Sequence, residues 1–248
     1  MNTTKNVTPV LLLALCTAAA GADITALGAS RSVGASRFLN LPGSPFQSQY
    51  DSFDQWPTLG DMNATARTQG GEGATVQESV ASQASALMKG SKLAFLNTQL
   101  TVRPGQWYRG TSGQGQTGAY SDFYFSVEVT SPVDALLSAS ARGTVTPFAT
   151  LNADITASRN GQPMFNYNIA PTGGDYDDST SWMFRLEPGI WEFTAMTNAS
   201  GLTGAFNGVD RLGDMRFNFE VTAALVPNVG GATVLAAMGL LTGLRRRR

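Results

Sequence analysis

Apolar and polar residues alternate with a period of two through most of the middle of the chain. The alternation is clear in five runs, Phe123–Val129, Leu151–Ala157, Phe165–Ile169, Trp191–Ala195 and Met215–Val221. A strand with this pattern has one face in an apolar core and the other in water, as in half-buried antiparallel sheets. The runs therefore predict antiparallel strands.

Turn-forming residues separate these runs. They occur at Arg103–Gly105, Asn160–Pro163, Pro171–Gly174, Glu187–Gly189 and Asn207–Gly208, and they include the Gly, Pro and Asn that tight turns require. We expect Glu187–Gly189 to form a tight hairpin or a corner. Strands joined in this way, without amphipathic helices between them, predict an all-β fold: an antiparallel β-sandwich that is jelly-roll-like.

Two interpretations remain open for residues 75–89. Helical spacing is seen in Val76, Val80, Ala84, Leu87 and Met88, and Thr75 with Glu78 would make a capping box. However, the stretch is rich in Ser, Gln and Thr, which favour strands and turns over helix interiors. We therefore favour paired strands, with a helix as the alternative.

Residues 23–62 are rich in Ser, Gly, Asn and Pro, and they also contain the aromatic residues Phe46, Tyr50, Phe53 and Trp56. Dense turn-forming residues predict irregular structure, whereas aromatic residues argue against disorder. We expect an irregular lead-in that lies across the folded domain.

Residues 1–22 have the pattern of a secretory signal peptide. Lys5 is the only charged residue, an apolar run follows, and Ala20 and Ala22 occupy positions −3 and −1 of a cleavage site after Ala22. We expect export through the translocon and removal of this segment by signal peptidase. A buried N-terminal helix is the alternative.

Residues 226–248 have the pattern of a membrane-sorting segment. Pro227 precedes the uncharged run Val229–Leu244, and four arginines follow, Arg245, Arg246, Arg247 and Arg248. A helix of this run would be about 24 Å long, which is short of a hydrocarbon core of about 30 Å. The arginines would hold the C-terminal end in the cytoplasm. The segment therefore suits a temporary anchor.

The order of Val226, Pro227 and Asn228, a short Gly-, Ala- and Leu-rich helix and the arginine run resembles the PEP-CTERM class of bacterial sorting signals. Asn228 and Val229 stand where the name-giving motif has Glu and Pro. The resemblance implies a bacterial exported protein whose tail is recognised and removed by an exosortase-like membrane enzyme. It also implies association with exopolysaccharide and with the cell envelope or biofilm matrix.

Composition excludes several classes of function. The chain has no histidine, and its one cysteine, Cys16, lies in the predicted signal peptide, so imidazole catalysis and thiolate metal sites are excluded from the body. The terminal segments contain Lys5 and Arg245–Arg248, which leaves twelve basic residues against eighteen acidic ones in the body. A body with this charge is not a nucleic-acid binder, because such proteins present a basic face.

Two groups of residues are candidate binding sites. Asp175, Asp177 and Asp178 follow two glycines, and carboxylates on a Gly-rich loop suit Ca²⁺, although a solvated acidic loop explains them equally well. Trp107, Tyr108 and Trp182 are candidates for stacking on a sugar ring, with packing as the alternative. No cofactor other than Ca²⁺ is suggested.

Catalysis has less support. No Ser-His-Asp set exists without histidine. A glycosidase needs two facing carboxylates, and the strand-associated candidates are Glu128, Asp154, Glu187 and Glu192. Each of them lies at an outward position or beside a turn, where charged residues are expected anyway. We predict no catalytic residues and no enzymatic activity.

The chain therefore divides into a signal peptide (1–22), an irregular lead-in (23–62), a β-sandwich domain (63–225) and a sorting segment (226–248). We expect an exported, non-enzymatic cell-surface or extracellular-matrix protein that passes through a membrane-anchored intermediate. The alternative is a surface-displayed carbohydrate-binding module.

Overall fold

The computed structural model describes residues 24–56, 59–72, 75–89, 92–103, 113–203 and 213–223. The predicted signal peptide and sorting segment lie outside these residues. Among the described residues, no helix has the length and apolar character needed to cross a membrane.

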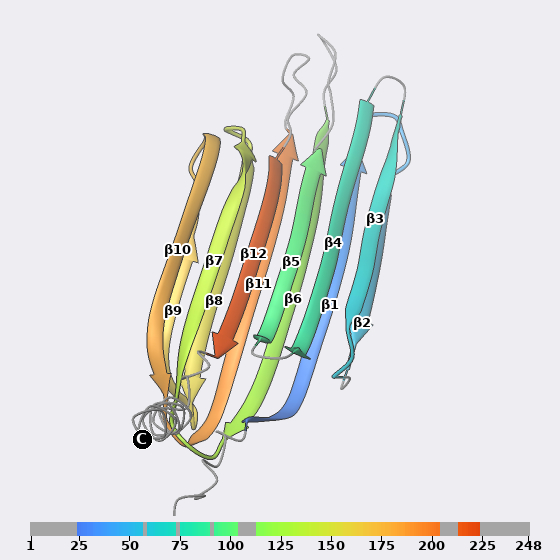
Figure 1. The fold of residues 1–248 in the computed structure, drawn as a ribbon. Helices are drawn as coiled ribbons and strands as arrows, with labels where there is room; N and C mark the ends of the chain where they lie inside the picture. The colour runs from blue at the N-terminus through green and yellow to red at the C-terminus, as the bar shows by residue number, and fades with distance from the viewer. Residues whose placement is uncertain are drawn as a thin grey trace, which may run out of the picture.

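In the described parts of the chain, antiparallel strands form two sheets that pack face to face with their strands nearly aligned (Figure 1). The first sheet contains β1 (Ile24–Asn40), β2 (Gln47–Gln55), β6 (Gln114–Val129), β8 (Ala149–Arg159), β9 (Gln162–Ile169) and β11 (Gly189–Thr203). The second sheet contains β3 (Met62–Glu72), β4 (Thr75–Lys89), β5 (Lys92–Arg103), β7 (Val133–Val145), β10 (Gly174–Leu186) and β12 (Gly213–Ala223).

The strand pairing confirms a β-sandwich and has the nested order of a jelly roll. The strand orders are β2-β1-β6-β11-β8-β9 and β10-β7-β12-β5-β4-β3. Within them β5 pairs with β12, β6 with β11, β7 with β10, and β8 with β9. The hairpins β1–β2 and β3–β4 then extend the first and second sheets beside β6 and β5.

The core lies between the sheets and is built from the alternating apolar residues. Phe123 of the first sheet meets Phe219 of the second edge to face, with ring centroids 6.1 Å apart. Phe125 and Phe193 stack within the first sheet at 6.4 Å. All four side chains are almost completely buried, and burial of one such ring contributes about 1.5–3 kcal/mol. The period-two runs are thus confirmed as strands.

Residues 75–89 form strand β4, as we favoured, and the helical alternative is wrong. β4 pairs with β3 on one side and with β5 on the other. Its inward positions include Gln77 and Gln83, which are fully buried. Their amides donate to backbone oxygens of the first sheet, Gln77 to Phe38 (2.8 Å) and Gln83 to Asp122 (3.2 Å). Polar side chains therefore tie the two sheets together at this side of the sandwich.

The prediction of an irregular lead-in over residues 23–62 is wrong. These residues contain the seventeen-residue strand β1, which pairs with β6 along most of its length and with β2 over residues 31–39. The inward positions of β1 include the small Ala29 and Ala35 and a buried Arg31, whose guanidinium donates to the backbone oxygen of Gly60 (2.5 Å). Inward and outward positions do alternate along β1. The sequence does not show this as an apolar–polar pattern, because small and charged residues occupy the inward positions.

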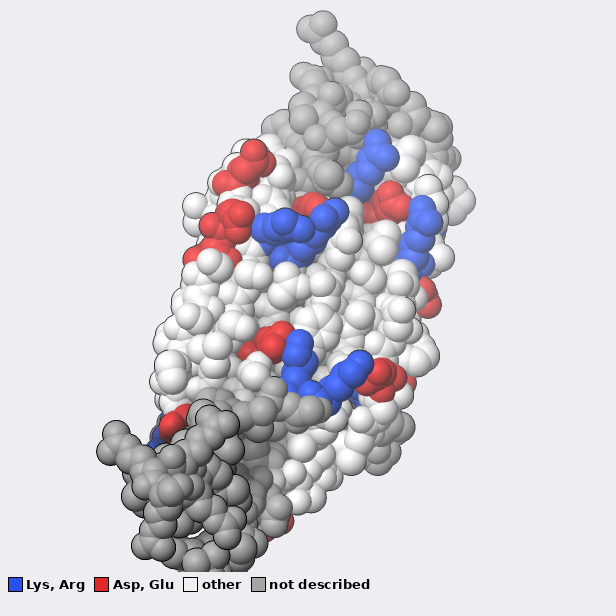
Figure 2. All heavy atoms as spheres, in the orientation of Figure 1, with Lys and Arg blue, Asp and Glu red and all other residues white. Residues whose placement is uncertain are grey.

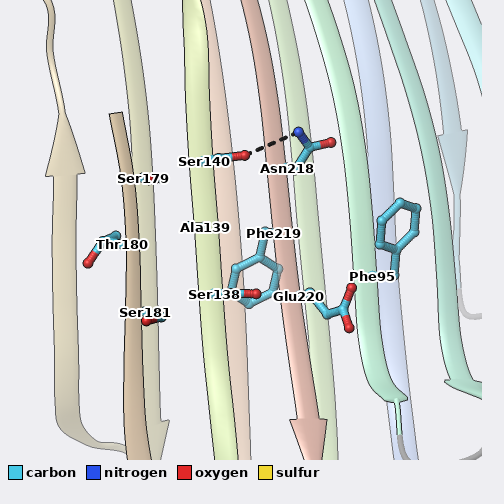
Figure 3. Close-up of a pocket in the computed structure, with 10 residues that line it drawn as sticks. All are labelled: Phe95, Ser138, Ala139, Ser140, Ser179, Thr180, Ser181, Asn218, Phe219 and Glu220. Atoms are coloured by element: carbon cyan, nitrogen blue, oxygen red, sulfur yellow. Dashed lines mark hydrogen bonds between the residues drawn. The ribbon is translucent and has the colours of Figure 1, made fainter. Parts of the chain in front are cut away.

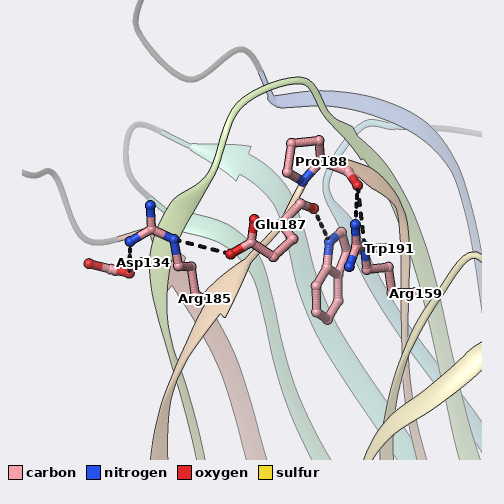
Figure 4. A network of polar contacts seen from close by, with 6 residues as sticks. All are labelled: Asp134, Arg159, Arg185, Glu187, Pro188 and Trp191. Atoms are coloured by element: carbon pink, nitrogen blue, oxygen red, sulfur yellow. Dashed lines mark hydrogen bonds and ion pairs between the residues drawn. The ribbon is translucent and has the colours of Figure 1, made fainter.

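The Glu187–Gly189 turn is a corner that takes the chain from β10 in the second sheet to β11 in the first (Figure 4). The indole nitrogen of Trp191 donates to the Glu187 backbone oxygen (2.8 Å), and Arg159 donates to that of Pro188 (2.7 Å). Arg185 forms an ion pair with Glu187 at 3.2 Å. These contacts fix the crossing between the sheets, and with it the position of β10 at the edge of the second sheet.

Candidate functional site

The outer face of the second sheet has a shallow groove of about 640 Å³ over β10, β7 and β12 (Figure 3). Its floor consists mostly of small hydroxyl side chains, with an amide beside them. On neighbouring strands Ser179 lies opposite Ser140 and Ser181 opposite Ser138, while Asn218 lies opposite Ser140 on the other side. The groove exists because these side chains are short, whereas residues around them are long.

Hydrogen bonds fix the amide in the groove floor. Asn218 accepts a bond from the Asn97 side chain (2.7 Å) and donates one to the Ser140 hydroxyl (3.3 Å). Hydroxyl and amide groups can both donate and accept. The floor is therefore a preorganised set of uncharged hydrogen-bonding groups.

One side of the groove is formed by Phe95 and Glu220. Lys92 lies with its amine 4.7 Å from the centre of the Phe95 ring and 2.6 Å from a Glu220 carboxylate oxygen. Partial burial would raise the pKa of Glu220, but hydrogen bonds from Lys92 and Thr222 and the charge of Lys92 outweigh it and lower that pKa. Glu220 is therefore ionised at neutral pH and oriented by Lys92.

The two ends of the groove differ in chemistry. At one end lie the exposed apolar side chains Met183 and Leu136, which are opposite each other on β10 and β7. At the other end lie Arg142 and Arg216, opposite each other on β7 and β12. Figure 2 shows this face with its charged side chains in two bands and an uncharged zone between them. On β12, Asn218 lies between Arg216 and Glu220, and its row across the sheet consists of Ser179, Ser140, Asn218 and Asn97.

Next to the two arginines, the backbones of β7 and β12 approach each other closely at Gly143 and Asp214. A Cβ atom on Gly143 would lie 1.8 Å from the backbone oxygen of Asp214 and 2.8 Å from the hydroxyl of Tyr176. That hydroxyl donates to the same Asp214 oxygen at 3.3 Å. Only glycine at position 143 therefore allows the Tyr176 side chain of β10 to reach across β7 to Asp214 on β12. Burial and the charge of Asp214 raise the pKa of the Tyr176 phenol, so it remains a donor.

Trp182 lies on the opposite side of β10 from the groove. It is half-buried and packs across the open edge of the sandwich, with its ring 4.4 Å from that of Phe165 and 5.1 Å from that of Tyr167. The Tyr167 hydroxyl donates to Asp178 (2.7 Å) beside this cluster. Trp182 thus closes the space between β9 and β10. Trp107 and Tyr108, like Ala20, Ala22, Val226, Pro227, Asn228 and Arg245–Arg248, lie outside the described residues.

The three aspartates suggested for Ca²⁺ are not brought together. Asp175 and Asp177 point outward from β10, whereas Asp178, one residue on, points to the other face and accepts from Tyr167. Asp175 accepts a hydrogen bond from Thr144 at 2.8 Å. Within the described residues, no group of three or more Asp, Glu, His or Cys side chains is arranged to hold a metal ion.

The strand-associated carboxylates Glu187, Glu192 and Asp154 each have polar partners in the structure. Glu187 is part of the corner described above. Glu192 lies on the outer face of the first sheet, where it accepts from Tyr124 and Ser158, each at 2.9 Å. Asp154 accepts from Asn152 and Asn168. These hydrogen bonds, within β8 for Asn152 and between strands for the other three, explain Glu192 and Asp154 as surface partners of polar side chains.

On the outer face of the first sheet, an aromatic ring covers a glycine of the neighbouring strand. The ring of Tyr120 lies over Gly34 on the neighbouring strand, where an added Cβ would be 2.1 Å from the ring. Its hydroxyl is 2.8 Å from that of Tyr50 on β2. An aromatic ring that covers a strand glycine in this way supports the sheet.

Sequence reasoning missed the groove residues. The alternation of Ser138, Ala139, Ser140 and Ala141 was visible, and so was that of Ser179 and Ser181. A search for outward positions occupied only by short hydroxyls would find both runs. Their meeting depends on the pairing of β7 with β10, which the alternation does not specify.

No model of a protein family matches this chain, and no curated protein matches it. Among solved structures, the enzymatically active domain of bacteriophage CBA120 tailspike protein 4 is similar over 64% of this chain and 19% of that chain, with 10% identity and a TM-score of 0.29. A CBM4 structure is similar over 57% of this chain and 87% of that chain, with 10% identity and a TM-score of 0.25. The exo-β-1,3-galactanase of Phanerochaete chrysosporium is similar over 72% of both chains, with 10% identity and a TM-score of 0.19. At these scores the likenesses do not bear on the function of this chain.

Proposed function

We propose that the folded body is a non-catalytic glycan-binding module of an exported protein, and that the groove over β10, β7 and β12 is its binding site. The observation that carries this proposal is the floor of the groove, where Ser138, Ser140, Ser179, Ser181 and Asn218 lie together on adjacent strands. A polysaccharide presents many hydroxyl groups, and these pair with groups that both donate and accept.

The shape and surroundings of the groove favour a polymer over a small substrate. It is a shallow depression on a sheet face, whereas sites for small molecules are concave and enclose most of the ligand. Phe95 and Met183 add apolar surface beside the hydroxyls, and the apolar faces of sugar rings pack on such surface. The ordered Asn97–Asn218–Ser140 hydrogen bonds reduce the conformational entropy that binding would otherwise cost.

A binding role also fits the titratable groups near the groove. Glu220 is held ionised by Lys92, so it lacks the raised pKa that a general acid for glycoside cleavage needs. The described residues that line the groove include no histidine or lysine that could activate the serines, and Lys92 beside the groove is paired with Glu220.

A pull-down experiment tests the proposal. Full-length protein in mild detergent is incubated with insoluble cellulose, chitin, xylan, β-1,3-glucan and galacturonan, and bound protein is measured. We expect retention by at least one polysaccharide, and no release of reducing sugar. Retention by none of them contradicts the proposal, and sugar release contradicts its non-catalytic part.

We further propose that the module reaches the cell surface or extracellular matrix through its terminal segments. Residues 1–22 and 226–248 carry this part of the proposal, on the sequence patterns described above. Pulse-labelling in the producing cell should show two decreases in size, one for each segment. A mature protein that keeps Arg245–Arg248 would contradict removal of the C-terminal segment.

A further inference from the structure

Arg142 and Arg216 form a pair of adjacent cations on the outer face of the second sheet. They lie directly opposite each other on β7 and β12, and both side chains are exposed. Neither guanidinium makes a hydrogen bond or an ion pair with any residue that the structure describes. Like charges directly opposite on neighbouring strands are destabilising.

Three other cations on the same face are ion-paired. Arg67 pairs with Glu78 at 2.6 Å, Lys92 pairs with Glu220 at 2.6 Å, and Arg185 pairs with Glu187 at 3.2 Å. This difference indicates that the Arg142–Arg216 pair is available to a ligand.

Acidic residues lie close to the pair without engaging it. Asp177 is the neighbour of Arg142 on β10, and Asp175 and Asp214 lie one row further along the strands. Asp175 accepts from Thr144 (2.8 Å), and Asp214 accepts from Thr101 (3.1 Å). These hydrogen bonds direct two of the carboxylates toward threonines, which leaves the guanidinium groups free to bind a bidentate anion.

The pair also lies at the end of the groove. Arg142 follows Ser140 by two residues on β7, and Arg216 precedes Asn218 by two residues on β12, in both cases on the same face. Two residues along a strand span about 7 Å, which is comparable with one sugar unit of a chain. A second depression of about 320 Å³ contains both arginines and adjoins the first. A sugar in the groove would therefore place its neighbour over the arginines.

We propose that Arg142 and Arg216 bind the anionic group of an acidic polysaccharide, a uronate carboxylate or a sulfate ester, while the neighbouring sugar lies in the groove. This inference rests on the proposed glycan-binding function and names its ligand class. A nucleic acid is the less suitable ligand, because its affinity requires many cations along the backbone and the depression at this end of the groove is lined by a single pair of arginines.

The test compares charged and neutral forms of the same polymer on the full-length protein. The probes are polygalacturonate, its fully methyl-esterified form, dextran sulfate and unmodified dextran, each titrated by calorimetry in mild detergent. The variants are Arg142→Gln with Arg216→Gln, and the control is Arg185→Gln, an ion-paired arginine on the same sheet. Loss of the repelling charges should leave thermal stability equal to or above that of the parent.

We expect an acidic polymer to bind about tenfold more tightly than its neutral form, and the double variant to abolish this preference. The control should retain it. Preference for polygalacturonate identifies a carboxylate ligand, and preference for dextran sulfate identifies a sulfate ester.

Equal binding of charged and neutral forms would overturn the inference while leaving glycan binding intact. A preference for the acidic form that survives in the double variant would overturn the assignment to these arginines. If none of the four polymers binds, the inference is again overturned. The pull-down on the neutral polymers cellulose, chitin and β-1,3-glucan then decides separately whether the proposed function also fails.

Discussion

Asn97 donates a hydrogen bond of 2.7 Å to Asn218, and Asn218 in turn donates to the hydroxyl of Ser140. The first bond connects β5 to β12 and the second connects β12 to β7. Asn97 lies outside the groove lining but determines which way the amide of Asn218 faces. The orientation of the groove floor thus depends on a residue that a bound glycan need not touch.

Removal of Asn97 should weaken glycan binding without removing any group from the groove. Asn97→Ala leaves the Asn218 amide free to rotate, and loss of one ordering hydrogen bond is worth about 1 kcal/mol, or about fivefold in the dissociation constant. Calorimetric titration with the polysaccharide retained in the pull-down measures this change.

The matched control is Asn152→Ala. Asn152 accepts a hydrogen bond of 2.7 Å from Asn168 on the outer face of the first sheet, away from the groove. It should change the dissociation constant by less than about twofold. Equal effects of the two variants would contradict the role assigned to Asn97.

Gly143 should tolerate no larger side chain. Gly143→Ala would place a methyl group against the Asp214 backbone, 1.8 Å from its oxygen, and separation of β7 from β12 should lower the free energy of unfolding by about 3 kcal/mol or more. Urea unfolding followed by circular dichroism measures the loss. Gly28→Ala is the control, because its nearest neighbour is the Ser126 hydroxyl at 3.8 Å, and a change within about 0.5 kcal/mol is expected there. Similar losses for both variants would show that the close approach at Gly143 is unimportant.

Asp122 should make the fold less stable at neutral pH than in acid. Burial raises the pKa of its carboxyl, a hydrogen bond with Ser32 opposes this, and the charge of Asp54 adds to it. Because the folded pKa lies above the unfolded value of about 4, the contribution of this group to stability is fully present below that value and is lost as pH rises through the folded pKa. Asp122→Asn should therefore raise the midpoint of thermal unfolding by about 1–3 °C at pH 7 and have no effect at pH 3. A lower midpoint at pH 7 would refute this assignment.

Glu220 should show the opposite dependence. Its folded pKa is lowered, since the hydrogen bonds from Lys92 and Thr222 and the charge of Lys92 outweigh the effect of burial. Its contribution is therefore present above the unfolded pKa of about 4 and is lost as pH falls through the folded pKa. Glu220→Gln should lower the midpoint of unfolding slightly at pH 7, because the pair is partly exposed, and have no effect at low pH. An effect that grows on acidification would contradict this reading.

The sequence predicted the fold class because the core strands alternate strongly. Phe123, Phe125, Phe217 and Phe219 are large and buried, so the period of two could be read directly. The prediction from this pattern failed for β1, where Ala29, Ala35 and the buried Arg31 occupy inward positions. Small residues suffice there because polar side chains, such as those of Gln77 and Gln83, fill the space between the sheets.

The candidate site was harder to predict than the fold. The serines of β7 and β10 are far apart in the sequence and meet only because the chain crosses between sheets before β10 forms. Aromatic residues drew attention to Trp182 instead, and the structure shows that it packs against Phe165 and Tyr167. Residue type identified neither the face nor the neighbours of these side chains, because both depend on long-range strand pairing.

Filling the groove with a large side chain shows directly whether glycan binds there. Ser179 and Ser48 are exposed serines on the edge strands β10 and β2, and only Ser179 lines the groove. Ser179→Trp and Ser48→Trp are compared in calorimetric titrations of the full-length protein with the polysaccharide that it retains best. We expect Ser179→Trp to raise the dissociation constant at least about tenfold and Ser48→Trp to change it by less than about twofold. Unchanged binding in Ser179→Trp, or equal loss in both variants, would contradict glycan binding in the groove.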